Sequence, residues 1–212
     1  MNLKMESKTD QEFFWSGKFG DSYIERNENN RLLTSNINFF IKSLSRTKDL
    51  KNCIEFGSNV GMNIKALKII YPHLKFHAVE INKKAAKLLG KIISPENIFQ
   101  ESILNFETQQ KWNLCLVKGV LIHINPEKLE EAYKKIVNAS DKYILICEYY
   151  SRKPESLAYR GHSNKLFKRD FAGEILDLFP NLILIDYGFV YHRDPNFPQD
   201  DISWFLIEKN NT

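Results

Sequence analysis

Two kinds of apolar pattern alternate along the chain from about residue 50 onward. Continuous apolar runs predict strands at Asn52–Phe56, Lys75–Ile81, Asn97–Gln100, Asn113–Lys118, Lys142–Tyr149, Leu182–Tyr191 and Ile202–Glu208. Apolar residues at three- and four-residue steps predict helices at Met62–Ile70, Asn82–Ile92, Glu127–Val137 and Asp170–Phe179. The crossovers between the first five strands are long enough to make neighbouring strands parallel. The pattern therefore predicts an α/β fold around a mostly parallel sheet of seven strands.

The two ends of the chain depart from this alternation. A loop without a helical pattern joins the last two predicted strands, so we expect the final strand to be antiparallel. At the other end, helical periodicity covers Asp10–Arg26 and Asn30–Leu44, before the first strand. We therefore predict one domain over residues 1–212, with a helical cap or lid at 1–48 and a sheet-forming core at 49–212.

A glycine turn and an acidic residue mark the ends of the first two predicted strands. The first strand carries Glu55 and runs into Gly57 and Gly61, and the second ends at Glu80. Gly57 allows a sharp turn, and Gly61 allows the next helix to begin close beneath a ligand. A carboxylate at the position of Glu80 can accept hydrogen bonds from both hydroxyls of a ribose. These residues predict a site for a cofactor that contains adenosine.

The spacing of the glycines distinguishes between such cofactors. A dinucleotide fingerprint, G-x-G-x-x-G, needs glycine at 57, 59 and 62, but the sequence has Gly57, Asn59 and Met62. The pattern E-x-G-x-x-x-G instead resembles motif I of the class I methyltransferases that use S-adenosylmethionine (SAM), a family that usually has glycine where Asn59 stands. The sulfonium and amino group of SAM suit an acidic first turn, which Glu55 supplies. This resemblance implies a Rossmann-like fold with helices on both faces of the sheet.

Several longer motifs resemble a narrower group of proteins. They are Phe14–Asn27, Val117–Pro126, Glu148–Tyr150, Tyr159–His162, Leu166–Glu174 and Tyr187–Asp201. In these motifs the chain is similar to the methyltransferase-like proteins found with pseudaminic acid biosynthesis genes in bacteria. The resemblance covers nearly the whole chain. It implies SAM as the cofactor and an association with nonulosonic-acid sugars, or with the surface glycans built from them.

The motif and the strand ends together give a set of expected cofactor-binding residues. We expect Ile81 to pack on adenine, and Glu101-Ser102-Ile103 stands where the family places residues that touch the adenine amino group and ring. Arg26 could clamp the methionine carboxylate while Trp15 closes over it; alternatively, this helix packs on the sheet edge and Arg26 stays in solvent. The full set is Trp15, Tyr23, Arg26, Glu55, Gly57, Ser58, Asn59, Gly61, Glu80, Ile81, Ser102, Ile103 and Lys118.

Polar and aromatic runs that follow the later strands predict a pocket for the methyl acceptor. Segments 149–169 and 191–201 would form substrate loops, with arginines for a carboxylate or phosphate and aromatic faces for a sugar ring. The expected substrate-binding residues are Tyr149, Tyr150, Tyr159, Arg160, Tyr191 and Arg193. Several of these residues could instead brace their own loops. The expected substrate is a sugar or sugar nucleotide related to pseudaminic acid.

Methylation of a hydroxyl needs a base to remove the proton, and three histidines are candidates. His123 follows the fourth predicted strand, while His162 and His192 lie in the runs expected to bind a sugar. No spacing of histidines and carboxylates typical of a metal site stands out. We therefore expect metal-independent O- or N-methylation.

Composition and charge narrow the choice of partners. The net charge of +4 is mild and its charges are interleaved, which disfavours a nucleic-acid partner. No apolar run approaches the about 20 residues that span a bilayer, and the N-terminus lacks an apolar signal segment. We expect a cytoplasmic protein without membrane contact, monomeric or homodimeric, whose cysteines are buried free thiols. Two alternatives stay open: a non-catalytic SAM-binding partner in glycan assembly, and a methyltransferase that acts on protein.

Overall fold

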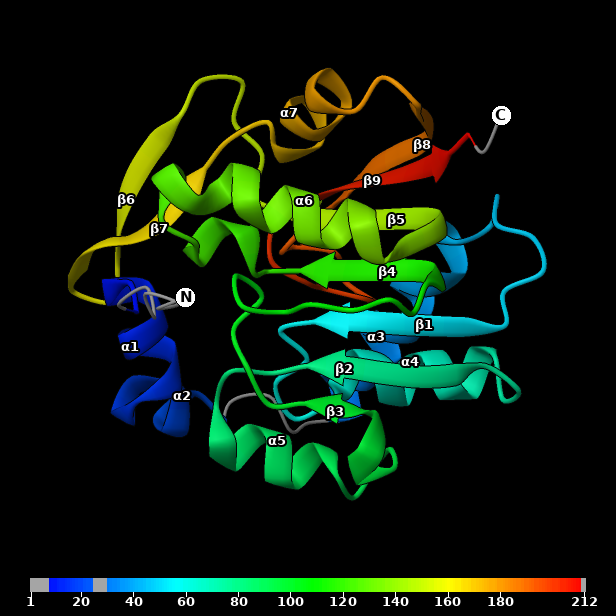
Figure 1. The fold of residues 1–212 in the computed structure, drawn as a ribbon, viewed down its shortest axis with the longest axis horizontal. Coiled ribbons are helices and arrows are strands. Elements are labelled where there is room, and N and C mark those ends of the chain that lie inside the picture. Colours follow the sequence, from blue (N-terminus) through cyan, green and yellow to red (C-terminus); the bar gives the residue numbers. More distant parts are fainter. Residues whose placement is uncertain (1–7, 25–29, 211–212) are drawn as a thin grey trace, which may run out of the picture.

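The computed structural model describes residues 8–24 and 30–210. Its main sheet has seven strands in the order β3-β2-β1-β4-β5-β9-β8 (Figure 1). The strands are β1 (Asn52–Phe56), β2 (Lys75–Val79), β3 (Ile98–Phe99), β4 (Trp112–Lys118), β5 (Ser140–Glu148), β8 (Leu182–Val190) and β9 (Ile202–Lys209). Strands β1 to β5 pair in parallel, whereas β9 pairs antiparallel with β5 and β8. The predicted seven-stranded sheet with an antiparallel last strand is confirmed.

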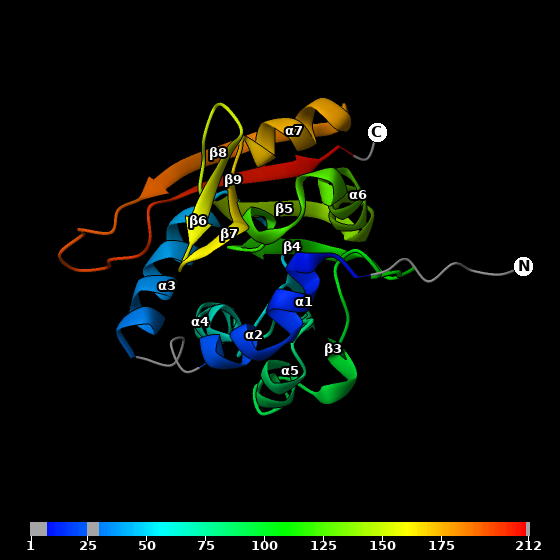
Figure 2. The ribbon, with the colours of Figure 1, turned by 90° about the vertical axis from the view of Figure 1, so that its left-hand side faces the viewer.

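Helices cover both faces of this sheet (Figure 2). One face packs against α6 (Leu129–Ala139) and α7 (Phe171–Leu178), and the other against α3 (Asn30–Ser43), α4 (Met62–Ile70) and α5 (Lys83–Leu89). Leu116 and Val117 are neighbours on β4, yet they belong to the apolar clusters on opposite faces. Because both faces are buried, the central strands carry the continuous apolar runs seen in the sequence.

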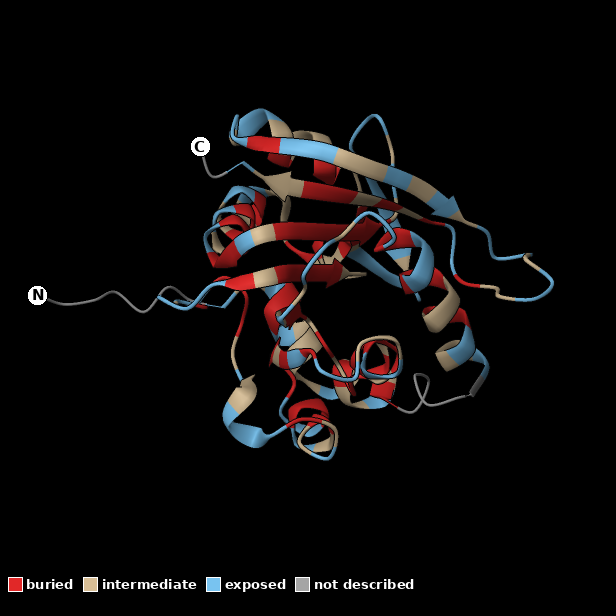
Figure 3. Cartoon of the chain, turned by 90° about the vertical axis from the view of Figure 1, so that its right-hand side faces the viewer, coloured by how far each residue is buried: buried red, intermediate tan, exposed pale blue. Residues whose placement is uncertain are grey.

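Burial decreases from the centre of the sheet toward β8, which is an edge strand (Figure 3). In β8 only Leu182 is buried, while the side chains of Tyr187 and Phe189 are 68% and 58% exposed. The loop that follows β8 therefore starts at an exposed edge of the molecule. This starting point limits which parts of the site the residues of the loop can contact.

A β-hairpin stands apart from the main sheet, in a segment that the sequence pattern predicted as a loop. Strands β6 (Glu155–Tyr159) and β7 (His162–Lys168) pair antiparallel. The two residues between them, Arg160 and Gly161, have φ values of 52° and 83°. A two-residue turn with both φ values positive matches the twist of a hairpin. The hairpin projects from the sheet toward the N-terminal helices (Figure 1).

The N-terminal helical stretch is divided into two short helices. Helix α1 (Asp10–Ser16) begins at a capping box formed by Thr9 and Glu12, and α2 (Lys18–Tyr23) follows after Gly17. The single helix predicted over 10–26 is therefore wrong, because Gly17 has an extended backbone that interrupts it. The predicted cofactor residue Arg26 lies outside the described residues.

The remaining general expectations concern cysteines and membranes. Cys53, Cys115 and Cys147 are buried free thiols, as predicted. Within residues 8–24 and 30–210, no helix is long and apolar enough to cross a membrane.

Candidate active site

Two adjoining clefts lie at the carboxyl ends of the parallel strands. The first, here called the β2 cleft, is bounded by α1, α2 and the loops after β1, β2, β3 and β4. The second, here called the β5 cleft, is bounded by α3, the loops after β1, β4 and β5, and the hairpin tip. Both are lined by Tyr23, Gly57, Asn59, Gly119 and His123. The clefts therefore form one continuous site where an open α/β sheet binds its ligands.

The turn after β1 adopts left-handed backbone at three positions. Gly57 and Gly61 have φ values of 71° and 78°, and Asn59 has 47°. A Cβ on Gly57 would lie 2.4 Å from Val120, and one on Gly61 would lie 2.6 Å from Leu89. Asparagine is among the few residues with a side chain that adopt this conformation readily. Asn59 therefore keeps the turn that a glycine would make.

Glu80 lies directly after β2 and is 6% exposed. Its Oε2 accepts the backbone N–H of Asn59, and its Oε1 accepts that of Asn82, both at 2.7 Å. Burial raises the pKa of this carboxyl, and these backbone hydrogen bonds oppose that rise. Each carboxylate oxygen has further lone pairs that can accept a ligand hydroxyl. Glu80 thus joins the β1 turn to the start of α5 and lines the β2 cleft.

Glu55 lies beneath the β1 turn and is 1% exposed. Its Oε1 accepts a hydrogen bond from Asn63 Nδ2 at 2.6 Å, and its Oε2 has no partner among the described residues. Burial raises the pKa of this carboxyl to about 8, although Asn63 and Lys118 oppose the rise. Ser58, which lines the β5 cleft, bonds the Glu55 backbone oxygen at 3.0 Å. Glu55 therefore supports the turn from below and is not itself part of either cleft lining.

Lys118, at the end of β4, lines the β5 cleft together with Asp200. Its Nζ lies 5.6 Å from the centre of the Phe39 ring, on the α3 side of the sheet. Burial lowers the pKa of this ammonium, while Glu55 and Asp200 are among the groups that oppose the shift. A cation and a carboxylate therefore lie in the same cleft.

His123 ends a 3₁₀ turn, Leu121–His123, that follows β4. Its Nδ1 lies 2.6 Å from the backbone oxygen of Lys165. A carbonyl oxygen only accepts, so Nδ1 carries the proton and Nε2 is left with its lone pair. Burial lowers the pKa of His123 to about 4, which keeps the ring neutral at neutral pH. Its ring lies 4.5 Å from that of Trp15 and 5.0 Å from that of Tyr159, centre to centre.

Glu148, at the end of β5, holds the turn that carries His123. Its Oε1 accepts the backbone N–H groups of Val120 and Leu121, both at 2.9 Å. Burial raises the pKa of Glu148 to about 7, and these hydrogen bonds oppose the rise. The sequence placed Glu148 in a motif but did not predict this role, because the role depends on backbone N–H groups that are distant along the chain.

Helices α1 and α2 and the β6–β7 hairpin together cover the two clefts, and we call this cover the roof (Figure 2). Gln11 Nε2 donates to the backbone oxygen of Asn164 at 3.0 Å, and the rings of Phe14 and His162 lie 5.0 Å apart. From below, Asn82 Nδ2 donates to the backbone oxygen of Trp15 at 3.2 Å. The helices and the hairpin of the roof are therefore hydrogen-bonded to each other. The roof is also hydrogen-bonded to Asn82, whose backbone N–H donates to Glu80.

Tyrosines and charged groups surround the β5 cleft at the hairpin tip. Tyr149 bonds Asp200, and burial together with this carboxylate raises the pKa of the phenol. Burial and the neighbouring Tyr159 raise the pKa of Tyr23 in the same way. The guanidinium of Arg160 lies 5.6 Å from the ring of Tyr159. The lining of this cleft thus combines tyrosine rings with a cationic side chain, Arg160, and an anionic one, Asp200.

Most of the predicted site residues line one of the two clefts. In the β2 cleft these include Ile81, Ser102 and Ile103, although Ser102 Oγ also accepts the Leu104 N–H at 3.2 Å. Glu101, Glu148 and Asp200 also line the clefts, and each lies in a segment that the family resemblance singled out. The clefts are lined as well by polar residues that the sequence did not predict. They are Gln11, Asn36, Asn63 and Asn82. Most of these polar residues carry no local motif, so only their position in the fold distinguishes them.

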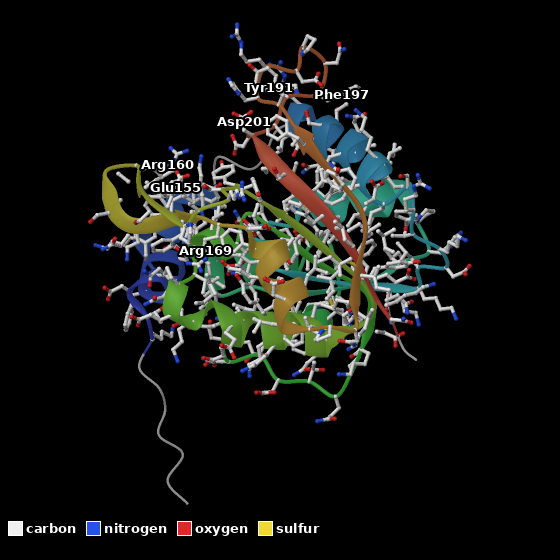
Figure 4. All side chains as sticks on the ribbon, turned by 90° about the horizontal axis from the view of Figure 1, so that it is seen from above. Glu155, Arg160, Arg169, Tyr191, Phe197 and Asp201 are labelled. Atoms are coloured by element: carbon white, nitrogen blue, oxygen red, sulfur yellow. The ribbon has the colours of Figure 1, made fainter. Side chains whose placement is uncertain are left out.

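Seven predicted residues that the structure describes line neither cleft. Glu55 and Gly61 lie in or beneath the β1 turn, and the other five are Tyr150, His162, Tyr191, His192 and Arg193. Figure 4 shows Tyr191 on the projecting 191–201 loop and Arg160 on the hairpin, two separate segments. The loop leaves from the exposed β8 edge, where His192 Nδ1 lies 2.9 Å from Asp201, and its residue Asp200 reaches the cleft. His162 packs against Phe14 in the roof, is exposed and lines neither cleft.

Metal ligands do not gather in the described part of the chain. Across residues 8–24 and 30–210, no group of three or more histidine, cysteine, aspartate or glutamate side chains could hold a metal ion.

No protein-family model and no curated protein matches the sequence. Solved structures do match. Magnesium protoporphyrin IX methyltransferase (ChlM) from Synechocystis PCC 6803 with bound SAM aligns with a TM-score of 0.66 and 12% identity, over 97% of this chain and 100% of that one. The 1,6-didemethyltoxoflavin-N1-methyltransferase of Burkholderia thailandensis aligns with a TM-score of 0.66 and 13% identity, over 91% and 86%. The chain has the class I methyltransferase fold.

A third structure with this fold is the O-methyltransferase from a trans-AT PKS multienzyme of Brevibacillus brevis, in complex with S-adenosyl-L-homocysteine (SAH). It aligns with a TM-score of 0.62 and 15% identity, over 97% of this chain and 81% of that one. At these identities the likeness establishes the class I methyltransferase fold, and any conclusion about chemistry depends on the residues of the clefts.

Proposed function

We propose that this protein is a SAM-dependent methyltransferase that acts on a small molecule. One observation carries the proposal. The turn after β1 has left-handed backbone, and its Asn59 N–H donates a hydrogen bond to Glu80, at the end of β2. Both Asn59 and Glu80 line the β2 cleft. The fold supports it, since solved proteins of this fold contain SAM or SAH. Those proteins act on small molecules such as 1,6-didemethyltoxoflavin.

The β2 cleft suits the adenosine part of SAM. Glu80 would accept the ribose hydroxyls, and Ile81 and Ile103 would contact the faces of the adenine. Trp15 and Tyr23 would cover the ligand from the roof.

The β5 cleft begins at the β1 turn and suits the methionine part of SAM. Ser58, Asn59 and Lys118 line this region, and the Lys118 ammonium can pair with a carboxylate. Arg26, the sequence-based candidate for this role, lies outside the described residues, whereas Lys118 lines this part of the cleft.

Bound SAM would supply an electrophilic methyl group on its sulfonium. The protein would hold the acceptor in line with that methyl group, and this positioning would supply most of the rate acceleration of the displacement. As the acceptor oxygen or nitrogen bonds to the methyl carbon and the carbon–sulfur bond breaks, His123 Nε2 would take the acceptor proton. Three properties favour His123 over His162 and His192 as this base. Its ring is neutral, its Nδ1 proton is donated to the backbone oxygen of Lys165, and the residue lines both clefts.

The acceptor that we propose is a sugar or sugar nucleotide of the pseudaminic acid kind. Arg160 would pair with its carboxylate or phosphate, and the rings of Tyr149 and Tyr159 would contact its apolar faces. Asp200 adds an acceptor for a sugar hydroxyl or an amino group.

Calorimetry with SAM and SAH tests the cofactor. We expect binding by the wild type and a loss of about 10- to 100-fold in affinity for Glu80→Ala, because charge-assisted hydrogen bonds to the ribose are lost. Glu127→Ala, at an exposed carboxylate on the surface, is the matched control. If the wild type did not bind, or if Glu80→Ala bound as well as the wild type, the cofactor assignment would be wrong.

Labelled methyl transfer onto a panel of sugars and sugar nucleotides tests the reaction. For the acceptor that is methylated, His123→Ala should keep SAM affinity within about 3-fold and lower the transfer rate by about 10²- to 10⁴-fold. His162→Ala, in the roof but lining neither cleft, is the control and should keep the rate. A His123→Ala enzyme of undiminished rate would exclude this histidine as the base.

A further inference from the structure

Helix α1 contributes two unused polar atoms to the β2 cleft. Gln11 and Trp15 are four residues apart, so they lie on one face of the helix, and both line the cleft. Gln11 Oε1 and Trp15 Nε1 are buried and have no hydrogen-bond partner within residues 8–24 and 30–210. A buried polar atom without a partner costs about 1–3 kcal/mol. One acceptor and one donor without partners, on two residues that both line the cleft, indicate a ligand that supplies their partners.

The orientation of the Gln11 amide is fixed by the hairpin. Gln11 Nε2 lies 3.0 Å from the backbone oxygen of Asn164, and that oxygen can only accept. The amide nitrogen must therefore face Asn164, and Oε1 must be the free acceptor. Because the side chain is only 7% exposed, it has little freedom to turn away from the cleft.

Hydrogen bonds through Asn82 connect the backbone of α1 to Glu80, which would bind the ribose. The backbone oxygen of Trp15 accepts a hydrogen bond from Asn82, and the backbone N–H of Asn82 donates to Glu80. Trp15 is therefore at the ribose end of the β2 cleft. Gln11 is one helical turn away, about 5.4 Å along the axis, which corresponds to the distance from a ribose to its base.

We propose that Gln11 Oε1 accepts a hydrogen bond from the 6-amino group of the adenine base. Trp15 Nε1 donates to a ring nitrogen or a ribose oxygen of the same nucleoside. The inference rests on the proposed function, since it takes the β2 cleft as the site of adenosine. It makes α1 a part of base recognition and not only a cover over the cofactor. Because Gln11 also bonds Asn164, one side chain joins the base to the hairpin.

The test compares SAH with S-inosylhomocysteine, in which an oxygen replaces the 6-amino group. An oxygen opposite Gln11 Oε1 would leave two acceptors facing one another, so the wild type should prefer SAH by about 10- to 100-fold in calorimetry. In Gln11→Leu the preference should fall to about 3-fold or less. Phe13→Ala is the control, because Phe13 lies on the same helix but is 61% exposed, and it should keep the wild-type ratio.

Glu101 is the rival acceptor, since its carboxylate also belongs to the lining of the β2 cleft. We expect Glu101→Ala, which removes this acceptor, to keep the preference for SAH. Loss of the preference in Glu101→Ala with its retention in Gln11→Leu would assign the amino group to Glu101 and overturn the inference. Equal affinity of the wild type for both ligands would overturn it as well, while leaving the cofactor proposal intact.

A second variant covers the case in which Gln11→Leu binds neither ligand. Gln11→Glu retains an acceptor oxygen but loses the donor to Asn164. A retained preference for SAH in this variant supports the inference, and equal affinities overturn it. If the wild type binds neither ligand, the proposed cofactor itself is wrong, an outcome distinct from all the others.

Discussion

At the scale of single residues, Asn59 shows how a departure from a family motif can leave geometry unchanged. Its φ of 47° is the conformation that glycine would adopt there, and its N–H donates to Glu80. Asparagine reaches this conformation at low cost, whereas a β-branched residue does not. The substitution therefore adds an amide to the cleft without removing the backbone bond on which the turn depends.

This argument predicts the effect of changing Asn59. In urea unfolding, Asn59→Val should lower the free energy of unfolding by about 1–2 kcal/mol relative to Asn59→Gly, because valine is strained at this φ. Asn59→Gly is the matched control and should stay within about 1 kcal/mol of the wild type. Equal stability of the valine and glycine variants would contradict a left-handed turn at this position.

Glu55 predicts a pH dependence of folding. Its pKa is about 8 in the folded state, against an ordinary value of 4.5, so between these values the folded protein binds more protons than the unfolded chain. Stability from this group is therefore greatest at low pH and decreases as pH rises toward the folded pKa. Relative to Glu55→Gln, the wild type should lose at least about 1 kcal/mol between about pH 5 and pH 8.

The check for Glu55 is urea unfolding of both proteins across that pH range. Glu127→Gln, a change at an exposed carboxylate, should follow the wild type at every pH. Parallel curves for the wild type and Glu55→Gln would show that the buried carboxyl does not titrate as described.

Residues within local motifs were predictable from sequence, and residues that depend on distant contacts were not. Gly57 and Glu80 have fixed spacing relative to strand ends, which is why their positions at the cleft could be predicted. Gln11 and its partner Asn164 are separated by 153 positions, and no local pattern marks either. The packing of the roof, which the sequence does not reveal, brings them together.

At the scale of elements, the hairpin shows where hydrophobic patterning fails. All residues of β6 except Tyr159 are exposed, so this strand has no apolar face from which to predict it. Its turn residues Arg160 and Gly161 carry the only local signal, a glycine at a position of positive φ. Strands of the main sheet were predictable because burial on both faces requires long apolar runs.

Asn82 is the element-scale connection between α5 and the roof. Its side-chain oxygen caps α5 by accepting the N–H groups of Lys84 and Ala85, while its Nδ2 donates to Trp15 and to Asp21. Asn82→Asp keeps the capping oxygen and removes the donor. We expect unchanged stability of α5 but faster amide hydrogen exchange in α1 and α2, measured by mass spectrometry.

Asn82→Ala is the comparison for this experiment, because it removes both functions. It should also lower the free energy of unfolding by about 1 kcal/mol through loss of the cap. If α1 and α2 exchanged at the wild-type rate in both variants, Asn82 would not be what holds the roof.

At the scale of the whole molecule, the order and direction of the strands were predictable from sequence. Which loop residues contact the clefts was not. The order of strands and helices follows from alternating patterns and from the rules of βαβ connection. The course of the 191–201 loop depends on β8 being an exposed edge strand, a property of the assembled sheet. Tyr191 and Arg193 were predicted to bind substrate from their chemistry and from their place after a strand, but they line neither cleft.

Ligand binding should stabilise the whole molecule. A ligand at 100 times its dissociation constant adds about 2.7 kcal/mol to the free energy of unfolding, which corresponds to a rise of about 5–10 °C in Tm for a chain of this size. SAH at that concentration should produce this shift in calorimetric melting of the wild type. Glu80→Ala at the same concentration of SAH should show a much smaller one.

The bond between Gln11 and Asn164 also has a consequence for the order of folding. A contact between residues so distant along the chain closes a large loop, which costs conformational entropy. Such a contact is therefore expected to form after contacts between residues that are nearer in sequence. The parallel sheet can assemble before the first helices find the hairpin. We therefore expect refolding monitored at Trp112, which is fully buried in the core, to be complete before Trp15 reports the closed cleft.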